Sequence, residues 1–274
     1  MSLRCSLACI SLGAGLALAC VSLTGCGSAL APTTTTSAAI SVTGNWQLAS
    51  AAASATKLAA ISGELTGTSS SITGILHADA SDASNACIAA NAPFEVSGSA
   101  NKANLVTLTG ALANGKITIT GTLAADGQSL VSPTYTVTGG TCAFAAPAAA
   151  TAHFYSSISG NYAGSFSDPN GQVISITAAL TQPPASDTDG NFQLSGTGTM
   201  PNNPCFPTTV TVSNSQVTGG SFNLTYTDAT TQNSVSTLGT FSADGSTLTV
   251  TQWTLSGPCG SDTGTGLLIK QVAQ

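Results

Sequence analysis

Cysteine is the residue type with the clearest chemical potential in this chain. Four of the eight cysteines fall within the first 26 residues, and the others form two widely spaced pairs, Cys87 with Cys142 and Cys205 with Cys259. Neither pair has the close Cys-x-x-Cys spacing or the partnered histidine of a zinc site, so we expect no metal there. Sulfurs this far apart in sequence suit disulfides, which persist in oxidising compartments.

The first 25 residues have the composition of an export signal. Arg4 supplies a positive charge, and the stretch from Cys5 to Val21 is uncharged and rich in alanine, leucine, glycine and serine. An uncleaved anchor is the alternative, because the stretch approaches the roughly 20 residues that span a bilayer. No basic cluster follows it, so we expect residues 1–25 to be removed.

The segment ends in Leu23-Thr24-Gly25-Cys26, which resembles the lipobox of bacterial lipoproteins. In that family the chain is cut before the cysteine, which then carries a thioether-linked lipid. The resemblance implies that Cys26 holds the protein to a membrane. Cys20 is a weaker candidate, because Leu18 stands where a small residue is needed. No Asp occupies the second position after Cys26, which by the same resemblance favours the outer membrane, on its periplasmic or cell-surface side, over the inner membrane.

Charge is scarce in the remaining chain. Four lysines stand against eleven acidic residues once Arg4 has left, a net charge of −7. Such a surface repels nucleic acids and offers no polybasic contact with anionic lipid. The lipid on Cys26 is therefore the expected membrane contact, and residues 26–42, rich in Thr, Ser, Ala and Pro, are expected to form a flexible tether.

An internal repeat organises the rest of the chain. Gly44-Asn45-Trp46 returns as Gly160-Asn161-Tyr162, and Ala125-Asp126-Gly127 returns as Ala243-Asp244-Gly245, at an offset of 116 to 118 residues. The cysteine pairs follow the same offset. We predict two tandem homologous domains, residues 43–156 and 159–272, each of ordinary domain size. So little chain separates them that they are expected to touch.

Three pairings of the four later cysteines are possible. Pairing Cys87 with Cys142 and Cys205 with Cys259 is favoured, because each repeat then carries its own bridge. Loops of this length make each bridge worth roughly 4 kcal/mol in the chain-entropy model.

Within each repeat the apolar residues alternate with polar ones, as in residues 115–123, and turn signals such as Asp126-Gly127 and Asp244-Gly245 separate the runs. No stretch after the signal has a helical period. We predict an all-β fold of two antiparallel domains with seven or eight strands each, most simply closed up-and-down barrels, which leave no exposed edge.

The opening Thr43-Gly44-Asn45-Trp46, followed by a meander of about eight strands, resembles a small calycin-type barrel of lipocalin or avidin size. The resemblance implies that Trp46 and Tyr162 plug one end of each barrel. Avidin-like biotin sites use several tryptophans, whereas this chain has only Trp46 and Trp253, so biotin binding does not carry over. A pair of immunoglobulin-like sandwiches, which are also all-β and disulfide-bridged, is the alternative.

Catalytic and cofactor motifs are not evident. His77, Asp79 and Asp82 could supply metal ligands, but the second repeat has no matching histidine, and a solvated loop is the simpler interpretation. His153 has no acid or nucleophile nearby in sequence, and Asp187 and Asp189 sit in a turn rather than across a cleft. The serines lack a Gly-x-Ser-x-Gly elbow. We expect a noncatalytic protein with no cofactor.

Tyr135 and Trp253 occupy equivalent places late in each repeat. Each is either a platform for a ligand in a barrel mouth or a core aromatic, and the core interpretation is favoured. The alternation breaks just before each ring, which predicts β-bulges there. Our leading functional hypothesis is a membrane-anchored binding module for a small or extended ligand. The alternative is a structural or protein-interaction component of the cell envelope.

Overall fold

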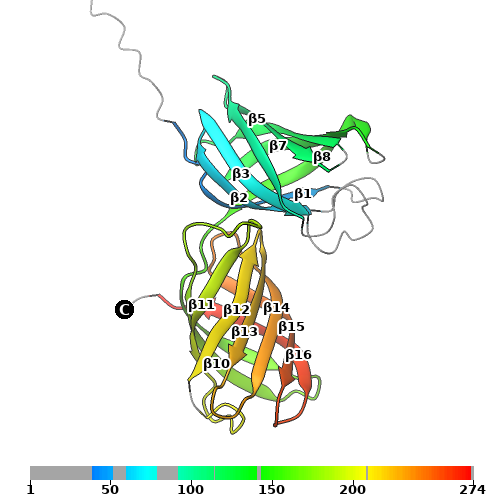
Figure 1. The fold of residues 1–274 in the computed structure, drawn as a ribbon. Coiled ribbons are helices and arrows are strands. Elements are labelled where there is room, and N and C mark those ends of the chain that lie inside the picture. The colour runs from blue at the N-terminus through cyan, green and yellow to red at the C-terminus, as the bar shows by residue number, and fades with distance from the viewer. Residues whose placement is uncertain are drawn as a thin grey trace, which may run out of the picture. The chain divides into compact units, whose positions relative to one another are not determined.

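A computed structural model describes residues 39–51, 60–78, 92–113, 115–140, 143–207 and 209–272. Their regular elements are sixteen strands, which form two closed barrels of eight (Figure 1). The first barrel contains β1 (Gly44–Ser50), β2 (Ala60–Thr68), β3 (Ser71–Ala78), β4 (Phe94–Ala100), β5 (Leu105–Leu112), β6 (Gly115–Leu123), β7 (Ser129–Thr138) and β8 (Phe144–Tyr155). The second contains β9 (Gly160–Ser167), β10 (Val173–Thr181), β11 (Phe192–Thr199), β12 (Val210–Thr218), β13 (Ser221–Thr227), β14 (Ser234–Phe241), β15 (Thr247–Ser256) and β16 (Asp262–Lys270).

Both barrels have the simplest antiparallel topology, in which each strand pairs with its neighbours in sequence. Pairing of the first strand with the last closes each barrel, as in Trp46 opposite Phe154 and Gly164 opposite Leu268. Closure confirms the predicted barrels and excludes the sandwich alternative, because a sandwich would keep its two sheets apart. Several predicted features lie outside the described residues. These are the signal segment 1–25, most of the tether 26–42, Cys26, Cys87, Cys142, Asp79 and Asp82.

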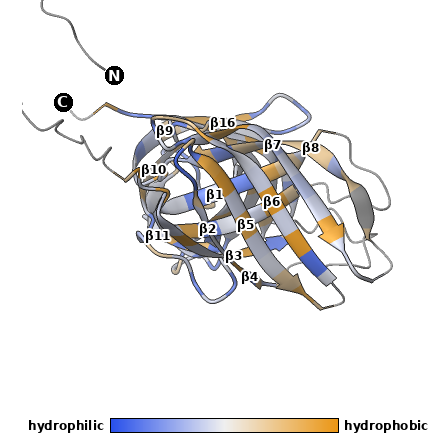
Figure 2. Ribbon diagram, turned by 90° about the horizontal axis from the view of Figure 1, so that it is seen from above, coloured by the Kyte–Doolittle hydropathy of each residue, from blue (hydrophilic) through white to orange (hydrophobic). Residues whose placement is uncertain are grey.

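Side-chain alternation places an apolar core inside each barrel. On β6, Ile117 and Ile119 are buried while Lys116 points outward, and the ribbon changes between apolar and polar colours along such strands (Figure 2). Each barrel has one continuous apolar cluster of its own. Burial of this surface, worth about 25 cal/mol per Å², is the main favourable contribution to folding.

The aromatic residue of each Gly-Asn-aromatic motif is buried. The indole Nε1 of Trp46 donates to the carbonyl of Val42 at 2.7 Å, and the hydroxyl of Tyr162 donates to the carbonyl of Gly245 at 2.6 Å. Burial, with a smaller contribution from the nearby Asp244 carboxylate, raises the pKa of Tyr162 to about 12. Val42 and Ile158 each precede their motif by the same distance and are likewise buried in their barrels.

Hydroxyl side chains replace charges on the outside of the first barrel. A cross-strand row joins Thr66, Thr73, Ser97, Thr109 and Thr118 across five neighbouring strands. The hydroxyls of Thr66 and Thr73 are hydrogen-bonded at 2.9 Å. Such cross-strand pairs help stabilise the sheet, and they give this weakly charged chain a polar exterior.

No helix in the described part of the chain is long and apolar enough to cross a membrane.

Candidate functional site

Apolar side chains fill much of the interior of the first barrel among the described residues. A cavity of about 30 Å³ lies there, lined by apolar side chains such as Trp46, Leu76 and Leu108. This is room for roughly one water molecule. Small barrels are commonly filled by their own side chains, so we looked for a binding site at the barrel ends and on the outer walls.

The open end of the second barrel contains a groove of about 640 Å³. Its lining comes from the β9–β10 turn with the start of β10, the loop between β11 and β12, the β15–β16 turn with the start of β16, and residues of β14 and β15. In an up-and-down barrel these connections meet at one end, because alternate turns lie at opposite ends. Segments far apart in sequence are therefore brought to one site.

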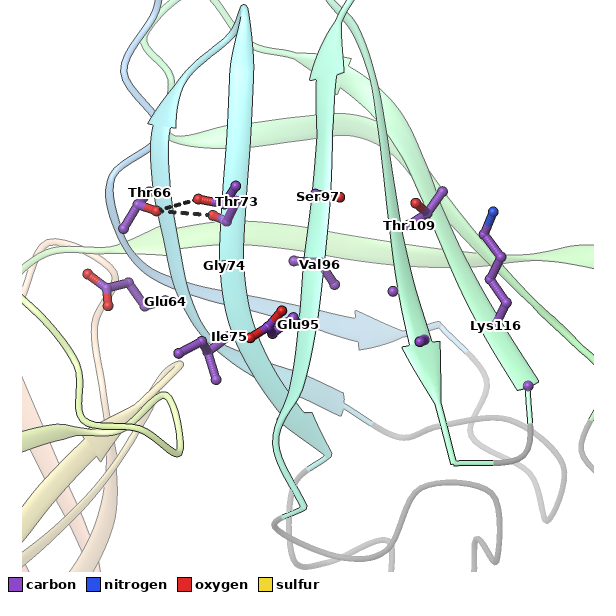
Figure 3. Close-up of a pocket in the computed structure, with 13 residues that line it drawn as sticks. Glu64, Thr66, Thr73, Gly74, Ile75, Glu95, Val96, Ser97, Thr109 and Lys116 are labelled. Carbon is purple, nitrogen blue, oxygen red and sulfur yellow. Dashed lines mark hydrogen bonds between the residues drawn. The ribbon is translucent and has the colours of Figure 1, made fainter.

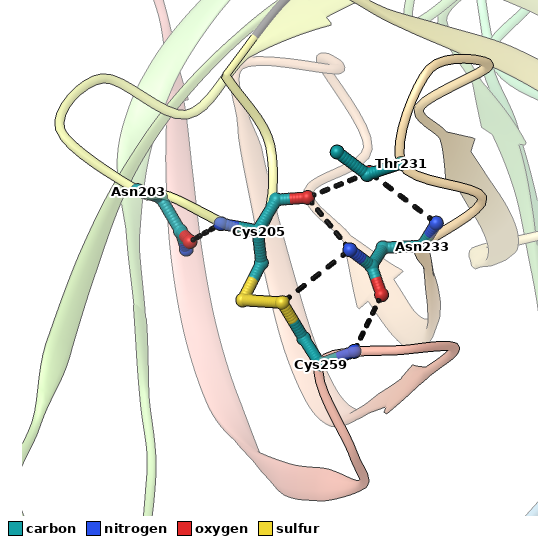
Figure 4. The surroundings of a disulfide bond; sticks show 5 residues. All are labelled: Asn203, Cys205, Thr231, Asn233 and Cys259. Carbon is teal, nitrogen blue, oxygen red and sulfur yellow. Dashed lines mark hydrogen bonds between the residues drawn. A yellow bond between two sulfur atoms is a disulfide. The ribbon is translucent and has the colours of Figure 1, made fainter.

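A disulfide between Cys205 and Cys259 fixes two sides of this groove, as the cysteine spacing predicted (Figure 4). Asn233 braces the bridge: its Nδ2 donates to the carbonyl of Cys205 at 2.9 Å, and its Oδ1 accepts from the amide of Cys259 at 3.0 Å. Thr231 donates its hydroxyl to the same Cys205 carbonyl. The groove wall is thus cross-linked covalently and through the buried side chain of Asn233.

Trp253 lies at the floor of the groove. Its ring is 1% exposed and stacks on Phe166 with centroids 6.0 Å apart, and its Nε1 donates to the carbonyl of Ser167 at 3.3 Å. An extra residue between Val250 and Trp253 forms the predicted bulge. Trp253 therefore closes the floor from below rather than offering an open ring face.

Tyr135, the equivalent of Trp253, is 1% exposed and belongs to the apolar core of the first barrel. The predicted bulge before it is present as well, between Val131 and Thr134. Among the described residues, Trp253 lines a groove, whereas Tyr135 is a core residue.

The groove combines an apolar floor with an electronegative rim. Ile174, Phe206 and Leu255 join Trp253 below, while amides and two carboxylates, Asp168 and Asp262, lie around it. The Asp168 carboxylate already accepts hydrogen bonds from the amides of its own turn, so it serves to shape the rim. No lysine, arginine or histidine occurs among the described residues of the lining. Such a groove disfavours anionic ligands and suits neutral or cationic ones.

Sequence reasoning did not single out the loop that forms this wall. Pro201, Pro204 and Pro207 surround Cys205, and proline restricts the backbone on both sides of a cysteine that must meet a distant partner. That density of proline at a disulfide was the available signal.

A second hollow, of about 750 Å³, lies on the outer wall of the first barrel (Figure 3). Its lining includes the hydroxyl row of Thr66, Thr73, Ser97 and Thr109, with carboxylates and one lysine at the margins. It is the larger hollow, yet it has no aromatic floor and no cross-linked wall. We therefore regard the groove of the second barrel as the stronger candidate.

His77, one of the three residues considered as metal ligands, donates from Nδ1 to the carbonyl of Asp189 at 2.8 Å. Among the residues that the structure describes, no three His, Cys, Asp or Glu side chains gather closely enough to hold a metal. His153 lies on β8, opposite Gln47 and Ser129, with its side chain exposed.

No protein-family model matches this chain, and no curated protein sequence matches it. Among solved structures, the chain is similar to the crystal structure of kievitone hydratase from Nectria haematococca, at 10% sequence identity. The match covers 85% of this chain and 90% of that chain, with a TM-score of 0.22. At this level of similarity it carries no argument about function.

Proposed function

We propose that the protein is a noncatalytic binding module that uses the groove at the open end of its second barrel. The observation that supports this most is the make-up of the groove: apolar side chains such as Ile174 and Leu255 in its lining, a wall fixed by a disulfide, and no cationic group among its described lining residues. The expected ligand is neutral or cationic and has an apolar body.

We also propose that the mature chain is exported and anchored by a lipid on Cys26. The lipobox-like run at residues 23–26 and the apolar segment before it support this. A Cys26→Ser variant is expected to leave the membrane fraction. The parent protein, extracted from membranes, is expected to begin at residue 26 and to have the added mass of lipid. An unmodified Cys26 in that extract would contradict the anchor and leave the groove proposal intact.

Tryptophan fluorescence tests the groove directly. Replacing Trp46 by phenylalanine leaves Trp253 as the only tryptophan, so emission reports on the groove floor. Three probes share a hexyl chain and differ in charge: hexyltrimethylammonium, hexyl glucoside and hexanesulfonate. We expect a saturable change with the cation, the neutral glycoside or both, and none with the anion.

A lysine at the groove rim provides the control. Val173 is 60% exposed and lines the groove, so Val173→Lys should add a positive charge without disturbing the core. The added lysine should weaken binding of the cationic probe and strengthen binding of the anionic probe. Leu238→Lys, at a residue that is 52% exposed and not part of the lining, should change neither. No saturable response to any probe, or equal effects of the two lysines, would contradict the proposal.

A second candidate function, an interaction component of the envelope, is supported by two exposed apolar residues on β16. Leu267 and Ile269 are 44% and 50% exposed and stand two positions apart, which puts them on the same outer side of the strand. Chemical cross-linking in cells is expected to capture a partner that a Leu267→Ser, Ile269→Ser variant no longer captures. Equal capture by both forms would count against this function.

A further inference from the structure

Asn45 is buried although it lies on the outer side of its strand. Trp46 and Leu48 point into the barrel, so Asn45 points away from it, yet only 1% of Asn45 is exposed. Its side-chain amide makes two hydrogen bonds with a single residue of the second barrel. Nδ2 donates to the carbonyl of Gly219, and Oδ1 accepts from the amide of Gly219, both at 2.7 Å. The asparagine thus satisfies both backbone groups of one turn residue.

The turn between β12 and β13 is shaped to accept this contact. Gly219 has a φ of +53°, and a Cβ there would lie 2.6 Å from the hydroxyl of Ser62 and 2.9 Å from Cβ of Gln47. A Cβ on Gly220 would lie 2.7 Å from the ring of Tyr155. Both glycines therefore let the turn approach the first barrel more closely than a side chain would allow.

The loop between β10 and β11 makes a second contact with the same wall. The amide and hydroxyl of Ser186 both donate to Oε2 of Glu64, at 3.0 and 2.6 Å. His77 meets the carbonyl of Asp189 beside it, and a Cβ on Gly190 would lie 2.7 Å from the carbonyl of Ile75. Glu64 and His77 are both buried, so these are enclosed rather than surface contacts.

The β10–β11 loop and the β12–β13 turn, which together form the docking segments of the second barrel, are also hydrogen-bonded to one another. Asp187 accepts from the amides of Asp189 and Asn191 through Oδ1, which holds the loop in shape. The side chain of Asn191 in turn accepts a hydrogen bond from the hydroxyl of Thr218, next to Gly219. The loop and the turn therefore form one preorganised surface, so little ordering is needed when they pack on the first barrel.

The internal repeat supplies a natural control. Asn161 occupies the position of Asn45 in the second barrel, and its side chain is exposed among the described residues. The strand residue opposite Asn45 is Glu64, whereas the one opposite Asn161 is Ala179. A buried Asn paired with a Glu on the next strand is thus not required by the barrel fold, because the second barrel closes with an exposed Asn161 and with Ala179 in place of the Glu.

We propose that the outer wall of β1–β3 packs specifically against the β10–β11 loop and the β12–β13 turn. This interface, called the joint below, makes the two barrels unfold as a single cooperative unit. The joint leaves the groove open, because the docking turns lie at one end of the second barrel and the groove turns at the other. Since the joint buries hydrogen-bonded polar groups, removing one partner leaves the others unsatisfied and should uncouple the barrels.

Hydrogen exchange measured by mass spectrometry at increasing denaturant tests the joint in the full chain, because peptides report each barrel separately. In the parent protein, core peptides of both barrels are expected to open at the same denaturant concentration. In Asn45→Ala, the two barrels should open at different denaturant concentrations, and exchange of the less stable barrel should be faster by about tenfold or more. The matched Asn161→Ala variant should keep the barrels together at the parental rate.

Two further pairs keep the test decisive. Asn45→Asp preserves the shape of the side chain but turns an acceptor toward the Gly219 carbonyl, and Asn161→Asp is its control. Gly219→Ala adds a clash with the first barrel, whereas Gly171→Ala has the same kind of positive φ and nothing within 4 Å of the added Cβ. Separate opening of the barrels in the parent, or equal effects within each pair, would overturn the proposal.

Discussion

Tyr226 provides the sharpest test of how the second barrel is stabilised. Its ring is completely buried on β13, and its hydroxyl has no hydrogen-bond partner among the described residues. Burial raises the pKa of this phenol well above its ordinary value, so the hydroxyl stays neutral in ordinary buffers. An unpaired buried hydroxyl costs the free energy of its lost hydration, about 1 to 3 kcal/mol.

Tyr226→Phe removes that cost while keeping the ring and its contact with Phe166, whose centroid is 6.4 Å away. The free energy of unfolding is therefore expected to rise by about 1 to 3 kcal/mol. Urea denaturation of a variant whose only tryptophan is Trp253 measures this, with the midpoint moving up and the slope unchanged.

Tyr162→Phe is the matched control, because the same atom is removed from a hydroxyl that donates to the Gly245 carbonyl at 2.6 Å. Here a carbonyl loses its partner, so stability should fall by about 1 kcal/mol. The two substitutions are thus expected to have opposite signs. A loss of stability in Tyr226→Phe would refute this reasoning and would mean that the hydroxyl is bound, for example by a water molecule inside the barrel.

Two further predictions concern the disulfide and Asp244. Replacing both Cys205 and Cys259 by serine should lower the free energy of unfolding of the second barrel by about 4 kcal/mol, measured by urea denaturation without reductant; no change would mean that the bridge does not constrain the unfolded chain. A hydrogen bond from the Ser242 hydroxyl, with others from Ser246, lowers the pKa of Asp244 from 3.8 to about 2. Because this pKa is depressed on folding, the contribution of Asp244 is present above pH 4 and lost as the pH falls toward 2. Carboxyl NMR titration should give a pKa of about 2 for Asp244 in the parent and a higher one in Ser242→Ala, where only the hydrogen bonds from Ser246 and the backbone remain.

The alternation of apolar and polar residues was sufficient to predict the strands, the core and the turns. Asp126-Gly127, for example, forms the expected turn, with Gly127 at a φ of +72°. The same alternation occurs in barrels and in sandwiches, so it could not distinguish between these two folds. The choice depends on whether β1 pairs with β8, an interaction between residues about 110 positions apart that local periodicity does not encode.

The groove was predictable only in part, for a related reason. Trp253 and the cysteine pair marked its floor and one wall, because a broken alternation and a repeated spacing are visible in sequence. Its rim is assembled from turns whose only shared property is their position at one end of the barrel. Asp262, for example, begins β16 and gains its place beside the 200–209 loop only through closure of the barrel.

Asn45 and Asn161 carry this point further. They are identical residues in the same motif, and any pattern within one repeat treats them alike. Their environments differ because Asn45 is hydrogen-bonded to Gly219 of the second barrel, whereas Asn161 is exposed among the described residues. The information that distinguishes them lies elsewhere in the chain, in the Gly219-Gly220 turn and in the Pro183–Asn191 loop, which has no counterpart of similar length between β2 and β3. A feature that one repeat has and the other lacks is therefore the best sequence signal for contact between repeats, since the barrel fold itself does not require it.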